Sequence, residues 1–149
     1  MTLKEQLDVA MKDAMRAKDA LRLSTIRMAK SAIKYKEVEL IAQLDDQGVI
    51  GVLSTLAKQR KESAVAFREG NRLELAEKEE QELAVLLEFL PQQLDEAGIK
   101  VLIEKAVAEA GASSAKDMGK VMKLVTPQTT GRADGKLVSE LVKARLAGA

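Results

Sequence analysis

The residues best suited to chemistry lie near the carboxyl end, where lysines alternate with glycines and serines. Two runs stand out, Gly111–Met122 (GASSAKDMGKVM) and Gly131–Lys136 (GRADGK). Small residues let a backbone approach a ligand closely, and the free N–H groups at a helix start favour negative charge. Both runs therefore suit binding of an anion, and neither contains an obvious catalytic group.

The candidate phosphate-binding residues share this basic tail and lie close to two expected helix starts. They are Ser113, Ser114, Lys116, Lys120, Lys123, Arg132 and Lys136. Taken singly, Ser114 and Asp134 are explained as helix caps and the glycines as helix ends. Taken together, the clustered lysines and the small residues between them favour contact with phosphate.

Composition excludes several kinds of active site. The chain has no histidine and no cysteine, which removes the commonest general base, the commonest metal ligand and any disulfide. A phosphate loop is also excluded, because Gly119-Lys120 lacks the preceding glycine and is followed by Val121 instead of Ser or Thr. A Ser–Lys pair stays open, although no serine lies in a nucleophile elbow. We expect no catalytic residues, no cofactor and no metal.

Charge is distributed unevenly along the chain. Residues 1–36 contain 9 Lys/Arg and 4 Asp/Glu, residues 37–110 contain 8 and 16, and residues 111–149 contain 7 and 3. This pattern predicts positive surface at both ends and an acidic middle, although solvated helix faces would also produce it. No aromatic stacking platform or RNA-reading motif is present, so any RNA contact should involve phosphates and not bases.

Helical periodicity and capping residues predict seven helices and no strand. Their expected starts are Thr2, Asp19, about Val49, Asn71, Asp95, Ser114 and Asp134. Gly70 is expected to end the third helix in the left-handed conformation, and Pro127 to end the sixth. The predicted fold is all-α, a four-helix bundle followed by a smaller three-helix bundle. Pro91 interrupts the pattern and suggests domains at 1–92 and 93–149.

An ion pair is expected between the third and fourth helices. If they are antiparallel about Gly70-Asn71, Arg60 on the apolar stripe lies opposite a position flanked by Glu80 and Glu82. A lone buried charge is costly, so we expect a partly buried ion pair from Arg60 to one of these two acids.

Several segments resemble a known family. The tail Gly111–Leu146 resembles the carboxy-terminal tail of the B subunit of the glutamine-dependent aspartyl/glutamyl-tRNA amidotransferase, which also occurs in small proteins of the YqeY family. The remaining matches, in family order, are Leu21–Met28 (LRLSTIRM), Gln59–Ser63 (QRKES), Gly70–Leu73 (GNRL) and Phe89–Leu94 (FLPQQL). The resemblance implies the same four-plus-three helical fold. It also implies a tail that engages tRNA, while amidation occurs elsewhere in the larger enzyme.

Three functions follow from these observations. The leading one is a tRNA-binding accessory module with an aminoacyl-tRNA synthetase or an amidotransferase as a further partner. The second is a subunit that supports carbon–nitrogen ligase activity with glutamine as amide donor, a label that free-standing family members carry. The third is a protein–protein adaptor without RNA contact. We expect no DNA or membrane partner and a cytoplasmic location, because the chain lacks cysteine, a long apolar run and a signal-peptide core. If the tail does not bind RNA, the next candidates are Arg22, Arg27, Lys30 and Lys34.

Overall fold

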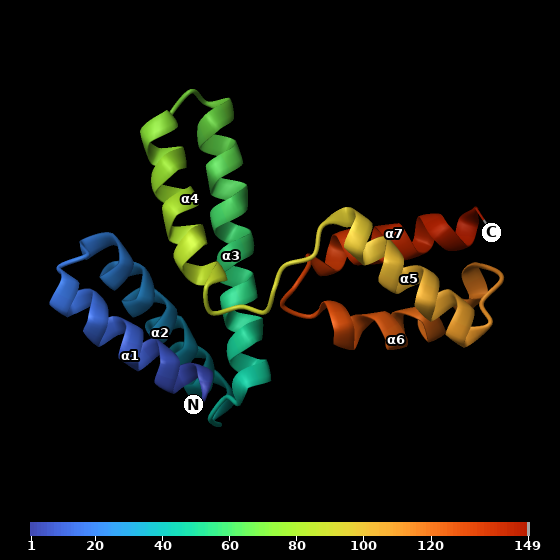
Figure 1. Cartoon of the computed structure of the whole chain (residues 1–149), viewed down its shortest axis with the longest axis horizontal. Helices are drawn as coiled ribbons and strands as arrows, with labels where there is room; N and C mark the ends of the chain where they lie inside the picture. Colours follow the sequence, from blue (N-terminus) through green and yellow to red (C-terminus); the bar gives the residue numbers. More distant parts are fainter. Residues whose placement is uncertain (149) are drawn as a thin grey trace. The chain divides into compact units, whose positions relative to one another are not determined.

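The computed structural model describes residues 1–148, which contain seven α-helices, one short 3-10 helix and no strand. The predicted all-α class is confirmed. The chain forms two compact units, Met1–Pro91 and a second that begins at Gln92 (Figure 1). Among the described helices, none combines the length and hydropathy needed to cross a membrane.

The first unit consists of two helical hairpins. Its helices are α1 (Leu3–Ala17), α2 (Ala20–Leu40), α3 (Asp46–Glu69) and α4 (Leu73–Leu87). The α1–α2 and α3–α4 hairpins pack together at one end and diverge from there, as Figure 1 shows. All four helices supply the shared core, which contains Leu7, Ile26, Ala29, Ile33, Val49, Leu53, Val85 and Leu86.

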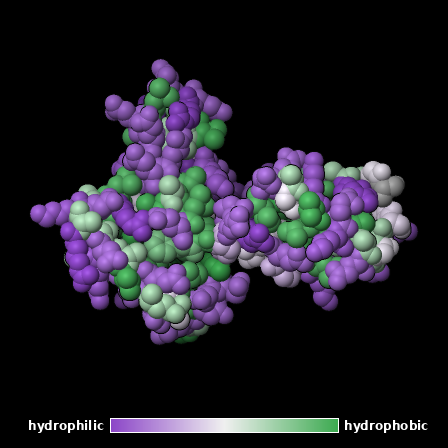
Figure 2. All heavy atoms as spheres, in the orientation of Figure 1, coloured by the Kyte–Doolittle hydropathy of each residue, from purple (hydrophilic) through white to green (hydrophobic). Residues whose placement is uncertain are grey.

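The outer part of the second hairpin extends beyond this core. The core takes no residue from positions 57–84, which we call the α3–α4 arm. The buried apolar residues of the arm are Ala57, Ala64 and Ala76, and these small side chains let the two helices approach closely. Some apolar surface on the first unit stays exposed among the polar residues (Figure 2).

The second unit is a smaller helical cluster. It contains α5 (Glu96–Ala110), the 3-10 helix η1 (Ala115–Asp117), α6 (Met118–Thr129) and α7 (Gly135–Ala147). Its core draws on all three α-helices and contains Ile99, Ile103, Ala106, Val107, Val121, Val125, Val138, Val142 and Leu146. Gly111 ends α5 in the left-handed conformation, with φ 62°.

Most predicted helix starts are confirmed. Thr2, Asp19, Asp95 and Asp134 each cap a helix by accepting a hydrogen bond from a backbone N–H of the first turn. α3 starts earlier than expected, because Asp45 caps it by accepting from the N–H of Gly48.

Three local predictions are wrong. Asn71, with φ 57°, takes the left-handed conformation expected of Gly70, whose φ is −82°. Asn71, the expected start of the fourth helix, does not cap it, since α4 begins after Arg72 without a side-chain cap. Pro127 does not end α6, which continues to Thr129. The carbonyl that loses its donor to this proline belongs to the exposed Lys123, where water can replace the missing hydrogen bond.

Candidate nucleic-acid interface

The start of η1 is occupied by a carboxylate of the chain itself. The N–H groups of Ser113 and Ser114 donate to Asp117 Oδ2 at 2.9 Å and 3.3 Å. These hydrogen bonds, first from Ser113 and then from Ser114, lower the pKa of Asp117. The two N–H groups offered to a phosphate by the sequence interpretation are therefore already satisfied. Ser113 and Ser114 belong to the local fold in this structure.

Three of the predicted lysines lie together on η1 and the first half of α6. Lys116, Lys120 and Lys123 are all exposed. Within residues 1–148, the one acid that contacts this group is Asp117, whose Oδ1 lies 4.0 Å from Lys120 Nζ. Lys116 and Lys123 form no ion pair with any described residue. We call Lys116, Lys120 and Lys123 the α6 lysine group; its charge is available to an external anion.

Arg132 has a different role from the one expected. Its Nε donates to the carbonyl of Gln92 at 2.9 Å and its Nη1 to the carbonyl of Gln128 at 3.2 Å. Next to it, Gln93 Nε2 donates to the carbonyl of Gly131 at 2.7 Å. These bonds fasten residues 92–93 to the α6–α7 loop, and we call them the Arg132 clasp. The guanidinium is therefore engaged within the fold.

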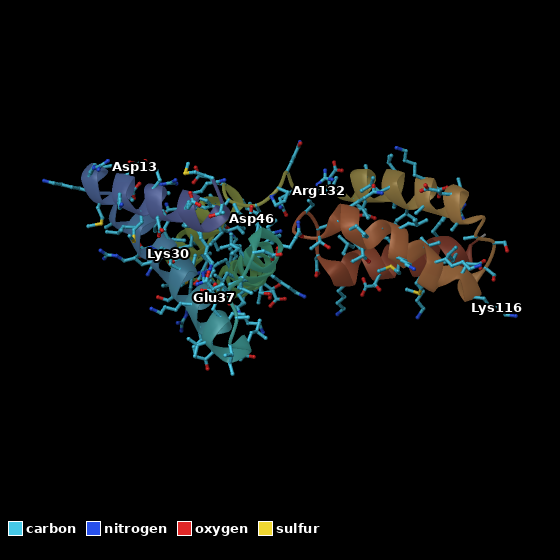
Figure 3. All side chains as sticks on the ribbon, turned by 90° about the horizontal axis from the view of Figure 1, so that it is seen from below. Asp13, Lys30, Glu37, Asp46, Lys116 and Arg132 are labelled. Carbon is cyan, nitrogen blue, oxygen red and sulfur yellow. The ribbon has the colours of Figure 1, made fainter. Side chains whose placement is uncertain are left out.

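The predicted basic residues do not form a single patch. Lys136 is exposed at the first turn of α7, with its backbone N–H donating to Asp134. η1 and the α6–α7 loop lie at opposite ends of α6, which spans roughly 18 Å at 1.5 Å per residue. Figure 3 accordingly shows Lys116 and Arg132 at opposite ends of the second unit. Lys143, also exposed on α7, was not singled out from the sequence; its spacing of seven from Lys136 places it on the same helix face.

The ion pair expected in the first unit involves one more acid than the sequence suggested. Arg60 Nε lies 2.9 Å from Glu82 Oε2 and 3.5 Å from Glu79 Oε2. Glu80 instead binds Arg68, at 2.5 Å from Oε1 to Nε, and this contact lowers the pKa of Glu80. Glu79 precedes Glu82 by three residues, so the helical period places both on one face. No group of three or more acidic residues that could hold a metal ion occurs within residues 1–148.

The alternative basic surface on α2 is partly neutralised. Arg22 pairs with Glu88, and its guanidinium lies 6.0 Å from the centre of the Phe89 ring. Lys30, labelled in Figure 3, pairs with Asp8. Two of the four cations of this surface therefore already have carboxylate partners.

Comparison with known proteins identifies relatives over much of this fold. The family model described as "Yqey-like protein" matches residues 4–146. A protein of Vanderwaltozyma polyspora is 40% identical over 93 residues, which cover 57% of this chain and 50% of the relative. One from Lachancea thermotolerans is 41% identical over 83 residues, covering 55% and 44%. One from Kluyveromyces lactis is 33% identical over 119 residues, covering 74% and 64%.

All three relatives are named "Altered inheritance of mitochondria protein 41, mitochondrial". The expected cytoplasmic location is contradicted by these names, which point to mitochondria. The chain spans about half the length of the first two relatives. Their names therefore refer to proteins that also contain other segments. The family model, in contrast, covers nearly the whole chain. The chain therefore belongs to the family of Yqey-like proteins.

Proposed function

We propose that this protein is a tRNA-binding accessory module whose second unit contacts the phosphate backbone. The observation that supports this most is the α6 lysine group, three exposed cations with a single carboxylate beside them. Lys136 and Lys143 add two exposed cations on α7. Ser113, Ser114 and Arg132 are left out of the proposed contact set, because the two serine N–H groups and two donors of the guanidinium already have partners within the fold.

Lysines of this kind suit a backbone more than a base. Each is a flexible point charge that neutralises a phosphate without a fixed direction, and neutralisation releases condensed counterions from the nucleic acid. Contacts of this kind position an RNA but carry no sequence information. The module would therefore bind many tRNAs, and selection among them would fall to a partner.

The resemblance of the tail to an amidotransferase subunit suggests the kind of partner. Gly111–Leu146 resembles the part of that enzyme that engages tRNA, and a synthetase or amidotransferase would supply the active site. The names of the relatives add a mitochondrial setting, so a suitable tRNA pool includes mitochondrial tRNA. A supporting role in glutamine-dependent amidation would depend on this same tRNA contact, so an amidation assay follows only if tRNA binding is found.

The test is a titration of the full chain against fluorescently labelled tRNA over a range of salt concentrations. Changing Lys116, Lys120, Lys123 and Lys136 to glutamine should weaken binding to every tRNA. It should also flatten the slope of log K against log salt by up to about one unit for each lost phosphate contact. Glutamine is polar and uncharged and has nearly the helix propensity of lysine, so the fold should be preserved.

The matched control removes four other exposed lysines, Lys12, Lys61, Lys78 and Lys105. It changes the net charge equally and should leave most of the affinity and slope in place. If both quadruple variants weaken binding equally, the attraction is a general charge effect and not a site. If the wild-type chain does not bind tRNA at low salt, the tRNA proposal is wrong and the adaptor function replaces it.

A further inference from the structure

The first unit carries an open apolar groove that its own helices leave unfilled. The groove lies between the carboxyl-terminal half of α2 and the amino-terminal half of α3 and encloses about 470 Å³. Its apolar lining comprises Ala32, Leu40, Leu44, Val52 and Leu56. Two side chains at its edge are largely exposed, Tyr35 at 76% and Leu40 at 51%. Exposed apolar surface beside a hollow is typical of an interaction site.

A glycine on α3 keeps this hollow open. Two glycines of the first turns of α3 line the groove, Gly48 and Gly51. A Cβ at Gly48 would lie 2.8 Å from Leu44 Cδ2, so internal packing explains that glycine. A Cβ at Gly51 would meet no heavy atom within 4 Å. Glycine is among the poorest helix formers, and nothing inside this fold requires it at Gly51.

The groove is held in a fixed shape before anything binds. Glu37 Oε2 accepts from the N–H of Leu44 at 2.7 Å and also pairs with Lys4. Asp46 Oδ1 accepts from the N–H of Leu3 at 2.9 Å, and Figure 3 labels both acids. These contacts anchor the α2–α3 loop, which ends the groove, onto the start of α1. A preformed surface loses little conformational entropy on binding.

The residue after the carboxyl end of α2 is unfavourable both in its backbone conformation and in its exposure to water. Ile41, the residue after α2, has φ 52° and is 93% exposed. β-Branched residues rarely adopt this left-handed conformation, where glycine is preferred. A strained backbone that presents a large apolar side chain to water points to a role outside the monomer.

We propose that a second copy of this chain occupies the groove, with the two α2 helices antiparallel about a twofold axis. A twofold interface must be self-complementary, so one patch must offer both protrusions and hollows. This patch does: Tyr35 and Leu40 protrude from α2, and the surface above Gly51 is hollow.

Charge favours a second copy over a ligand of one sign. On the outer face of α2, Lys36 Nζ lies 3.6 Å from Glu39 Oε1, and both side chains are about half exposed. An antiparallel partner would place its Glu39 opposite Lys36 and its Lys36 opposite Glu39. A ligand of one sign would meet a like charge at one of these positions, whereas a second copy offers the correct sign at both.

Sedimentation of the full chain, from low micromolar to submillimolar concentration, tests the proposal. The wild-type chain should show a reversible monomer–dimer equilibrium. Gly51→Leu fills the hollow and should raise the dimer dissociation constant by at least about tenfold. Gly119→Leu is the matched control, because a Cβ at this exposed helical glycine also meets nothing within 4 Å; it should leave the dimer unchanged.

Charge reversal tests the geometry without depending on the core. Lys36→Glu and Glu39→Lys, made separately, should each weaken self-association. An equimolar mixture of the two variants should associate, because every cross-pair is then attractive, and the double variant should recover the wild-type affinity. A wild-type chain that stays monomeric throughout, or a double variant no better than the single ones, would overturn the proposal in favour of a different occupant.

Discussion

Loss of Arg60 should destabilise the first unit more than loss of any exposed ion pair. Its side chain is 16% exposed, and the carboxylates of Glu82 and Glu79 beside it are 15% and 22% exposed. Arg60→Met would leave two partly buried carboxylates next to each other without a cation. Breaking a fully buried pair costs about 3–5 kcal/mol, and the residual exposure here reduces the expected loss of unfolding free energy to about 2–3 kcal/mol.

Removing all three charges should be far less harmful. The Arg60 guanidinium also contacts Met28 Sδ, so an apolar residue at position 60 retains a packing partner. The triple variant Arg60→Met, Glu79→Leu, Glu82→Leu should lie within about 1 kcal/mol of the wild-type stability, since the unpaired charges are gone. The difference between the single and triple variants isolates the penalty of the stranded carboxylates.

Urea unfolding followed by far-ultraviolet circular dichroism measures both effects. The control is Arg68→Met, which breaks the exposed pair with Glu80 and should cause a much smaller loss. An Arg60→Met variant as stable as the Arg68 control would contradict this prediction. So would a triple variant as unstable as Arg60→Met alone, since packing would then outweigh charge.

Four further outcomes are expected. Gly51→Ala should raise the unfolding free energy by about 0.5–1 kcal/mol in monomeric conditions, because alanine is the better helix former and its Cβ meets no neighbour; a lower thermal midpoint would contradict this. Hydrogen bonds from the Lys4 side chain and the Leu44 N–H hold the pKa of Glu37 below its ordinary 4.5. The Glu37 carboxylate therefore stabilises the folded state fully above that pH, and this contribution is lost as pH falls through the lower folded pKa. Glu37→Gln should therefore flatten the stability–pH curve on the acid side. A fragment ending at Pro91 should unfold cooperatively, because its core lies wholly within that unit; a broad, gradual transition would show that the units share stability. Arg132→Ala should leave the salt slope of tRNA binding unchanged but speed amide exchange near the clasp, and the opposite pattern would restore Arg132 as a phosphate ligand.

Local rules predicted the helix starts where a short polar side chain has no competitor. Asp19, Asp95 and Asp134 each precede an apolar stripe, and each caps its helix as expected. The prediction for the turn at residues 70–72 was wrong because both Gly70 and Asn71 tolerate the left-handed conformation. Asn71 took it, and its side chain was no longer placed to cap α4.

The candidate site was harder to predict because the type of a residue does not show whether another group of the same chain already occupies its hydrogen-bond donors. Lys116 and Arg132 look alike as cations in a glycine-rich tail. Only the folded chain shows that two backbone carbonyls already accept hydrogen bonds from the Arg132 guanidinium, while Lys116 is exposed. In the same way, the N–H groups of Ser113 and Ser114 were correctly placed at a helix start but were satisfied by Asp117. The available signal was Asp117, four residues after Ser113 and three after Ser114, because the second spacing is that of a capping box, which does form.

The α3–α4 arm has a consequence for how this family can vary. The shared core ends before Ala57 on α3 and resumes at Val85 on α4. Arg60 still contacts Met28 of α2, but the helical turns beyond Arg60 and Glu79 contribute no residue to that core. Insertions or deletions of matched whole turns in both helices would change the reach of the hairpin and leave the core residues in register. The length of the arm is thus open to evolutionary change independently of the fold that supports it.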